Sequence, residues 1–513
     1  MRDVKRVRGK GTSASSPRQA RGLSVSKAVE PLGVRRSAMA VGLLIISILL
    51  PALSACAAEM ALGDPRQMTF PPVEFTPPEP DRVVLENGMT VYFLEDHELP
   101  LVSITATMRT GGWLDPAGKI GLASLTGSVM RTGGGGGLSS KQVDEELEQF
   151  AGDVNISIGR QSGSASLDVL SKDLKRGLQI FAGLIQTPSF EPARVDLAKL
   201  QAIEGIRRRQ DNPGSIVGRE FMKLLYGADH PTARESDITS ITRITRDDLV
   251  AFHRKTIHPN GLMLGVTGDF DKSAMLILLQ DVFGGWKRGE VPVLTIADVP
   301  QVKTAKPVVR FVSKDTSQTH LRIGHLSIKE NDPDYVALAI ANDILGGSSF
   351  RSRLFNDVRT RQGLAYSVGS RLNTGMHDQG VWLMRAETKL PSTQEVITRF
   401  VANIERMRAE LVTDTELAEA KEAYVNSFVF SFASSSAIVG RLMTLEYDGL
   451  PKDFLQQLRA RVIALTKEDI LAAAKKHFHP ERLTILAVGS GEALPKLLSG
   501  FGEVKEINLA PES

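Results

Sequence analysis

Apolar residues recur along the chain at both helical and strand spacings, which predicts a mixed architecture. One set falls on a single helical stripe, at offsets of 0, 4, 7 and 11: Leu174, Leu178, Phe181 and Ile185. Pro188 follows and is a plausible end for that helix. Earlier, two β-rich runs within residues 82–94 flank Asn87-Gly88, a strong signal for a hairpin with a two-residue turn.

A long internal repeat is the most informative feature of the chain. Six residues recur in order at a constant separation of 221 positions: Thr245, Asp248, His258, Pro259, Leu262 and Gly268 return as Thr466, Asp469, His479, Pro480, Leu483 and Gly489. The block Ile216-Val217-Gly218-Arg219 returns as Ile438-Val439-Gly440-Arg441. Each copy predicts a helix capped by Thr, a short His-Pro break and a strand ending in Gly. A period this long predicts two similar domains in tandem rather than a solenoid.

Composition places the limits of these two domains. The Pro- and Val-rich stretch 291–307 is predicted to be a linker between domains at 81–290 and 308–510. Residues 57–80 are polar and rich in Pro, which predicts an extended tether. Residues 1–56 have a different character and are treated as a targeting segment.

The targeting segment has the order of a secretory signal. Arg35 and Arg36 precede an apolar run at residues 41–50, which is too short to span a membrane comfortably, and small residues follow. Leu53-Ser54-Ala55-Cys56 resembles a lipobox, in which the Cys becomes the acylated N-terminus of a bacterial lipoprotein. We therefore expect a lipid-anchored protein on the periplasmic side, at the outer membrane rather than the inner. The alternative is ordinary cleavage nearby, which leaves a soluble periplasmic protein.

Charge and cysteine content exclude some classes of protein. Beyond the first 55 of the 513 residues, 52 basic residues stand against 57 acidic ones, so no global field favours nucleic acid. Cys56 is the single cysteine, which excludes a disulfide framework within the chain and a thiolate zinc cluster.

Several motifs resemble those of the M16 peptidases, the pitrilysin and mitochondrial processing peptidase family. They are Asn87-Gly88, Gly121-Leu122-Ala123, Asp211-Asn212-Pro213, the two His-Pro-x-x-x-Leu blocks and residues 359–366. The resemblance covers about residues 80–508. It implies an α+β fold with two homologous tandem domains, each a mostly antiparallel sheet covered by helices. Such a chain would form half of a clamshell around a peptide chamber.

The zinc site of that family is missing from this sequence. Active members bind zinc through His-x-x-Glu-His on a helix and a distant Glu, but the matching residues here are Ser124, Gly127, Ser128 and, by the usual spacing, Gly205. Ser is a poor zinc ligand and Gly has no side chain, so no metal is expected in this chain. No Gly-x-Ser-x-Gly surrounds the two serines, and we expect them to be small residues on a buried helix face rather than nucleophiles. The five-glycine run at 133–137 lacks a phosphate-loop context and predicts a flexible loop.

A second family signature is retained. Residues 359–367 resemble it, after a predicted helix at 350–355 and the loop 346–349 that leads into this helix; Gly363 is a natural helix stop. The resemblance implies that Arg359 and Tyr366 reach across the chamber and donate hydrogen bonds near the scissile carbonyl of a substrate. On composition alone, a surface Arg and a packed core Tyr would be expected.

Three functions remain open from the sequence. The favoured one is a non-zinc-binding subunit, inactive alone, that supplies Arg359, Tyr366 and chamber wall to a partner bearing His-x-x-Glu-His and zinc, so that the heterodimer cleaves peptides or unfolded proteins. The second is a non-catalytic scaffold or peptide-binding module. The third is an independent hydrolase with unrelated chemistry.

Overall fold

The computed structural model describes residues 78–296, 299 and 306–509. Cys56, the targeting segment, most of the tether and part of the linker lie outside the described residues, and the predicted domain limits stay predictions.

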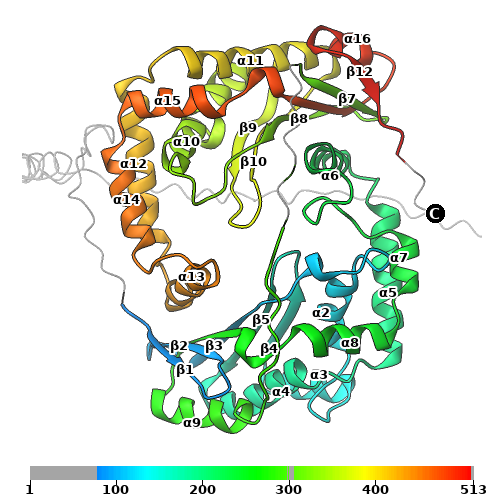
Figure 1. The fold of residues 1–513 in the computed structure, drawn as a ribbon, viewed down its shortest axis with the longest axis vertical. Coiled ribbons are helices and arrows are strands. Elements are labelled where there is room, and N and C mark those ends of the chain that lie inside the picture. The colour runs from blue at the N-terminus through cyan, green and yellow to red at the C-terminus, as the bar shows by residue number, and fades with distance from the viewer. Residues whose placement is uncertain (1–77, 297–298, 300–305, 510–513) are drawn as a thin grey trace, which may run out of the picture. The chain divides into compact units, whose positions relative to one another are not determined.

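Two six-stranded mixed sheets organise the described chain (Figure 1). The first, in the order β1-β2-β6-β3-β5-β4, contains β1 (Asp81–Val84), β2 (Thr90–Glu95), β3 (Leu101–Met108), β4 (Asp153–Ile158), β5 (Gly163–Leu170) and β6 (Leu262–Gly268). The second, in the order β12-β7-β11-β8-β10-β9, contains β7 (Val308–Ser313), β8 (Thr319–Leu326), β9 (Ala365–Asn373), β10 (Val381–Thr388), β11 (Thr484–Gly489) and β12 (Val504–Glu506).

Helices connect several of these strands. The first half contains α2 (Leu122–Thr132), α3 (Ser140–Gln149), α4 (Leu174–Gln186), α5 (Pro192–Arg208), α6 (Pro213–Tyr226), α7 (Ile238–Arg243), α8 (Arg246–Thr256) and α9 (Lys272–Phe283). The second contains α10 (Tyr335–Asn342), α11 (Thr393–Ala409), α12 (Asp414–Phe430), α13 (Ser435–Tyr447), α14 (Phe454–Ala464), α15 (Lys467–His477) and α16 (Leu494–Leu498). Helices α4 to α8 and α11 to α15 follow one another without an intervening strand.

The two sheets share one topology, which confirms the predicted α+β fold with a duplicated unit. The series β2-β6-β3-β5-β4 and β7-β11-β8-β10-β9 each begin with a parallel pair and continue with antiparallel pairs. Thr245 and Thr466 cap α8 and α15, and in each copy a capping box with the Asp three residues later holds the first turn. The repeated Gly residues end the central strands β6 and β11.

Two local predictions have different outcomes. The apolar stripe at 174–185 forms α4, whose capping residue Thr187 directly precedes Pro188, as predicted. The hairpin β1–β2 also forms, but Val84 pairs with Thr90, so the connection has five residues rather than two. Asn87 explains the longer turn, because its side-chain amide is buried and donates to the Phe283 carbonyl at 2.8 Å.

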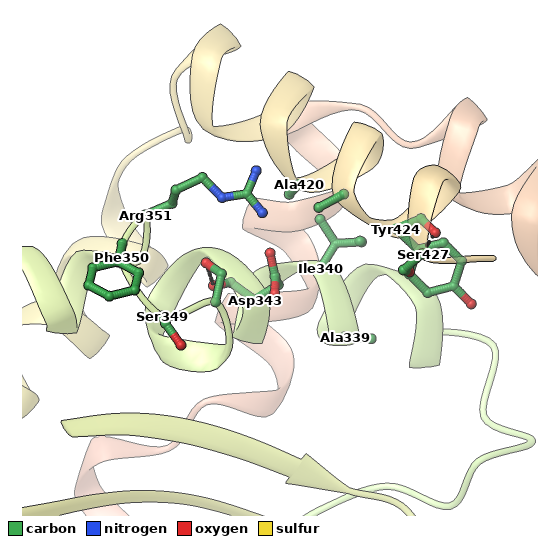
Figure 2. A pocket seen from close by; sticks show the side chains of 11 residues that line it. Ala339, Ile340, Asp343, Ser349, Phe350, Arg351, Ala420, Tyr424 and Ser427 are labelled. Carbon is green, nitrogen blue, oxygen red and sulfur yellow. Dashed lines mark hydrogen bonds between the residues drawn. The ribbon is translucent and has the colours of Figure 1, made fainter. Parts of the chain in front are cut away.

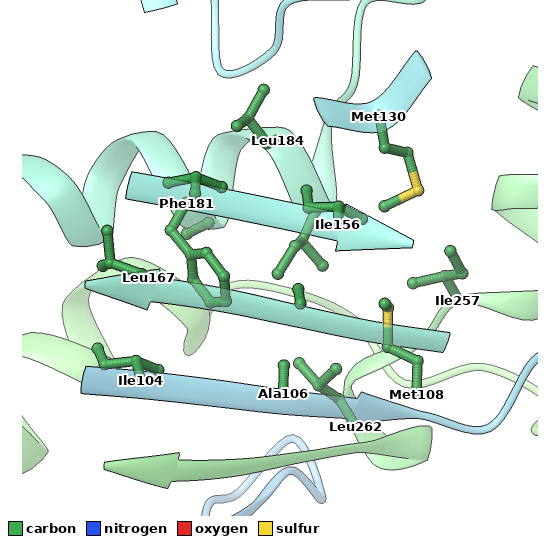
Figure 3. Packing of buried hydrophobic residues seen from close by; sticks show 14 of the residues in the cluster. Ile104, Ala106, Met108, Met130, Ile156, Leu167, Phe181, Leu184, Ile257 and Leu262 are labelled. Atoms are coloured by element: carbon green, nitrogen blue, oxygen red, sulfur yellow. The ribbon is translucent and has the colours of Figure 1, made fainter. Parts of the chain in front are cut away.

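Helices cover one face of the first sheet and bury its core (Figure 3). Phe181 of α4 lies next to Leu167 of β5, and Leu184 of α4, Met130 of α2 and Ile104 of β3 belong to the same buried cluster. These side chains are fully buried, and such burial contributes about 1.5–3 kcal/mol for each large apolar side chain.

The other face of each sheet is covered by a helix from the opposite half of the chain. Helix α6 packs on β8 and β11 of the second sheet, where Ile216 and Phe221 are buried against Leu486. Reciprocally, α13 packs on β2, β3 and β6 of the first sheet, where Val439 is buried against Met263. The Ile-Val-Gly-Arg repeat therefore marks two exchanged helices.

Hydrogen bonds reinforce this exchange. The Arg82 guanidinium donates twice to the Glu446 carboxylate, with both distances at 2.7 Å, and the Tyr92 hydroxyl donates to the same group. The Arg82 guanidinium holds the pKa of Glu446 below its ordinary value. The two halves are thus joined by polar contacts as well as by apolar packing.

Stability is expected to fall as the pH drops from about 6.5 towards 4. Burial lowers the pKa of His325 to about 4, and the ring sits between two fixed partners: its Nδ1 lies 2.7 Å from the Leu326 carbonyl, while its Nε2 accepts from the His479 N–H at 3.2 Å. In that pH range the unfolded chain binds the proton and the folded chain does not, a difference on the order of 3 kcal/mol. Urea unfolding across the range measures it, and His325→Gln should flatten the slope; an equal slope in both proteins would contradict this assignment.

Candidate functional site

Helix α2 carries three of the four positions where the family would bind zinc. Asp115 holds the start of this helix, because its carboxylate accepts from the N–H groups of Gly121 and Ala123 at 2.7 and 2.8 Å. Ser124 and Ser128 are exposed. The prediction that they lie on a buried face is wrong, because Leu125 and Val129 turn the apolar side of α2 to the core instead.

Gly127 is the buried member of the set, and α2 approaches β4 closely at this point. A Cβ atom added to Gly127 would lie 2.5 Å from the Ile158 nitrogen and 2.9 Å from the Ser157 carbonyl carbon. Both are backbone atoms of the strand, so no small rotation of a side chain relieves the contact. At the position of the catalytic base, the helix and the strand leave no room for a carboxylate.

Gly205 lies on α5, and a Cβ added there would meet nothing within 4 Å. It borders a cavity of about 790 Å³ whose walls carry Arg160, Arg209, Arg219, Arg234 and one carboxylate, Glu235. The four motif positions thus offer two hydroxyls and no imidazole or carboxylate. This donor set does not fit zinc.

The five-glycine run is packed against α4 rather than forming the free loop that its composition predicts. Gly133, Gly134 and Gly135 are buried, and the Gly134 carbonyl accepts from the Ser189 N–H at 2.9 Å. A Cβ on Gly136 would lie 2.9 Å from the Gly183 Cα. Glycine is needed here for close packing between two backbone segments.

Arg359 and Tyr366 lie together in the second half. The guanidinium carbon of Arg359 is 4.4 Å from the Tyr366 ring centre, 4.6 Å from that of Phe355 and 6.0 Å from that of Phe350. Tyr366 is 78% exposed and Phe350 is 73% exposed, so the Tyr is not the packed core residue that composition alone suggests. Cation–π contacts of this kind contribute about 0.5–1 kcal/mol each at exposed sites.

The backbone explains how these two side chains meet. Helical structure runs through a π-helical segment, Phe355–Arg361, which lies later than the predicted helix at 350–355. The predicted loop 346–349 is also partly helical, since Asp343–Gly347 forms another π-helical turn. Gly363, at φ 62°, then turns the chain into β9 as expected. Thr388 pairs with Ala365 while Glu387 pairs with Ser367, so Tyr366 is the extra residue of a β-bulge, a device that redirects a side chain.

Comparisons with known proteins find relatives among uncharacterized zinc proteases and M16 inactive domains. Residues 243–424 match the model described as the peptidase M16 inactive domain. The crystal structure of a peptidase M16 inactive domain from Pseudomonas fluorescens has a TM-score of 0.72 at 27% identity, over 80% of this chain and 98% of that one. The chain is therefore similar to proteins of the M16 peptidase family.

M16 relatives differ in the activity that their names state. An uncharacterized zinc protease of Mycobacterium tuberculosis is 26% identical over 367 residues, which are 70% of this chain and 82% of the relative. The non-peptidase homolog YmxG of Helicobacter pylori is 26% identical over 410 residues, 78% of this chain and 91% of the relative. Among the residues that the structure describes, no helix is both long and apolar enough to cross a bilayer.

A cavity of about 670 Å³ lies beside the M16 Arg/Tyr signature (Figure 2). Phe350 connects the two, because it borders this cavity and also approaches Arg359. Figure 2 shows Asp343 and Arg351 directed into the space between α10 and α12. Burial raises the pKa of Asp343, and the charge of Arg351 opposes that rise.

One group outside the M16 motifs resembles a metal site. Ligand atoms of Asp332, Asp334 and His477 all lie within 4.8 Å of one another. The Lys476 ammonium is 2.6 Å from the Asp334 carboxylate and holds its pKa below the ordinary value, with His477 acting in the same direction. Since the Lys476 ammonium and the His477 ring already contact the same oxygen of Asp334, at 2.6 and 2.7 Å, we assign no metal to the group.

Sequence reasoning missed the aromatic partners of Arg359. Phe355 and Arg359 are four residues apart on one helical segment, a spacing that places them on the same face and could have found the first partner. Phe350 carries no such signal, because the turn before the helix brings it back to the guanidinium.

Proposed function

We propose that this chain is the non-zinc-binding subunit of a heteromeric M16 metallopeptidase. The observation that carries the proposal is the contrast between its two signatures. The zinc positions on α2 and α5 hold Ser and Gly, while the Arg359–Tyr366 pair is assembled, stacked and open to solvent. A partner bearing His-x-x-Glu-His would supply zinc and the general base.

Arg359 and Tyr366 would stabilise charge on the substrate. A guanidinium and a phenol both donate hydrogen bonds, and donors aimed at a carbonyl oxygen stabilise the negative charge that develops there. Stacking of the Tyr366 ring on Arg359 restricts both side chains before the substrate arrives. The pair therefore needs little reorganisation when the reaction occurs.

The substrate would be an extended peptide or unfolded segment. Strand β9, which carries Tyr366, is the last strand in the order of the second sheet. A terminal strand can accept a further strand, which gives affinity through main-chain hydrogen bonds without fixing the sequence. Lipid anchoring through Cys56 on the periplasmic side is part of this proposal.

Reconstitution tests the proposal. The purified chain alone is expected to cleave no peptide, and a mixture with a His-x-x-Glu-His chain is expected to cleave in a chelator-sensitive manner. The control is the same mixture with the motif Glu of the partner changed to Gln. If the partner alone cleaves as fast as the mixture, this chain is instead a scaffold or peptide-binding module. Chelator-insensitive cleavage by the single chain would support an independent hydrolase.

A further inference from the structure

Three arginines gather on one face of the second sheet, on the side that α6 partly covers. Arg322 of β8 lies directly opposite Arg385 of β10. Arg371 of β9 lies opposite Leu383, and so diagonally from Arg385. Opposite and diagonal neighbours on one sheet face have Cβ atoms about 5–8 Å apart. We call Arg322, Arg371 and Arg385 the arginine stripe.

The stripe lacks the carboxylate partners that other arginines of the protein have. Arg353 donates two hydrogen bonds to Glu416, at 2.7 and 2.8 Å. Within residues 78–296, 299 and 306–509, no hydrogen bond and no ion pair within 4 Å involves a guanidinium of the stripe. Their N–H groups are available to a ligand.

Like charges placed directly opposite on a sheet destabilise it. Arg322 is half-buried, and this burial, followed by repulsion from Arg385 and Arg371, lowers the pKa of its guanidinium. Glu387 opposes that effect but lies 3.8 Å from His320, on the same face. The repulsion within the stripe therefore destabilises the folded chain, and a bound anionic ligand would reduce this repulsion.

The stripe lies where the sheet face is open. Helix α6 buries Val381, Leu383 and Leu486 on this face, whereas Arg371 and Arg385 are exposed. Arg371 is five residues along β9 from Tyr366. A strand-like ligand that follows β9 would meet both features.

We propose that the arginine stripe binds acidic side chains of the polypeptide substrate and so gives the Arg359–Tyr366 site a preference for acidic segments. The direction of the substrate past Tyr366 rests on the proposed function. A guanidinium matches a carboxylate through two parallel N–H···O bonds, and three of them suit carboxylates spaced along an extended chain.

A polypeptide fits these residues better than a nucleic acid does. Glu387 is two residues from Arg385 on the same face, so negative charge alternates with positive charge at the stripe. A continuous phosphate backbone would be repelled there, whereas separated carboxylates can avoid it. The acidic balance of residues 56–513 also provides no wider attraction for nucleic acid.

Peptide binding by the whole chain, without any partner, tests the inference. Fluorescence anisotropy would compare an unstructured fluorescein-labelled peptide containing several Glu residues with the same peptide containing Gln or Lys at those positions. We expect the Glu peptide to bind at least about tenfold tighter than the Gln peptide at low salt, and salt to weaken it. The double variant R371Q/R385Q should bind the Glu peptide about tenfold more weakly. The control variant R254Q, which changes an exposed arginine on α8, should bind it as tightly as the unmodified chain.

Thermal unfolding provides a second measurement on the same variants. R371Q/R385Q should unfold at an equal or higher temperature than the unmodified chain, because a repulsion is removed. Lost binding would then report the ligand contact and not a damaged fold. Equal binding of Glu and Gln peptides, unchanged binding by R371Q/R385Q, or displacement of the Glu peptide by an oligonucleotide of equal charge would each overturn the inference.

The outcomes separate this inference from the proposed function. Acidic-peptide binding that depends on the stripe, together with a failed reconstitution, would overturn the subunit role alone. A working mixture that cleaves Glu and Gln peptides equally well would overturn the stripe alone.

Discussion

The double variant Arg359→Ala/Tyr366→Phe is expected to lower kcat of the reconstituted mixture by about 10²–10³-fold, the effect usually seen when oxyanion donors are removed. Both groups would act only as charge develops, so kcat and kcat/KM should fall together. Steady-state kinetics at saturating partner concentration measure both. Tyr366→Phe alone keeps the ring that stacks on Arg359 at 4.4 Å, and so isolates the hydroxyl.

Arg361→Ala is the matched control for this prediction. Arg361 is an exposed arginine on the same helical segment, two residues from Arg359 and therefore directed away from it. This variant should keep kcat within about twofold of the unmodified value, since an exposed charge directed away from the Arg359–Tyr366 pair contributes little. Full activity in the double variant would mean that the Arg/Tyr signature has no catalytic role.

Gly127→Glu is expected to lower the free energy of unfolding by at least about 3 kcal/mol. Overpacking alone typically costs about 1–3 kcal/mol, and an unpaired carboxylate against the strand adds to this. The cause is the 2.5 Å contact that any Cβ would make with the Ile158 nitrogen. Urea unfolding measures the difference, and Gly127→Ala should show the overpacking part by itself.

Gly205→Glu provides the control, because nothing lies within 4 Å of a Cβ at that helical position. Replacing a helical Gly there should be neutral or stabilise slightly. It follows that restoring all four motif residues should not create a tight zinc site, which metal analysis of the purified variant would check. A Gly127→Glu protein as stable as the unmodified chain would refute the argument.

Local signals predicted much of the fold. The capping boxes at Thr245 and Thr466 act within three residues, so the repeat identified both helices and the strands that follow. The exchange of α6 and α13 could not be predicted in this way, because Ile216 and Val439 have the same neighbours in sequence whichever sheet they cover. Long-range packing decides that choice.

In the candidate site too, some features follow from local sequence and others from long-range packing. Serine and glycine at positions 124, 127, 128 and 205 indicated that zinc ligands are absent, since residue type alone decides that. Which of these residues face solvent depends on how α2 meets β4, a contact between distant segments. The arginine stripe was equally hidden, because Arg322, Arg371 and Arg385 become neighbours only through strand pairing.

The reciprocal exchange of helices has a consequence for synthesis. Chains are made from the N-terminus, so the first sheet exists well before Ser435–Tyr447 leaves the ribosome. Until then the apolar surface around Tyr92 and Met263, which α13 covers in the folded chain, stays exposed to solvent. The first half therefore cannot complete its packing until a helix of the second half has been synthesised.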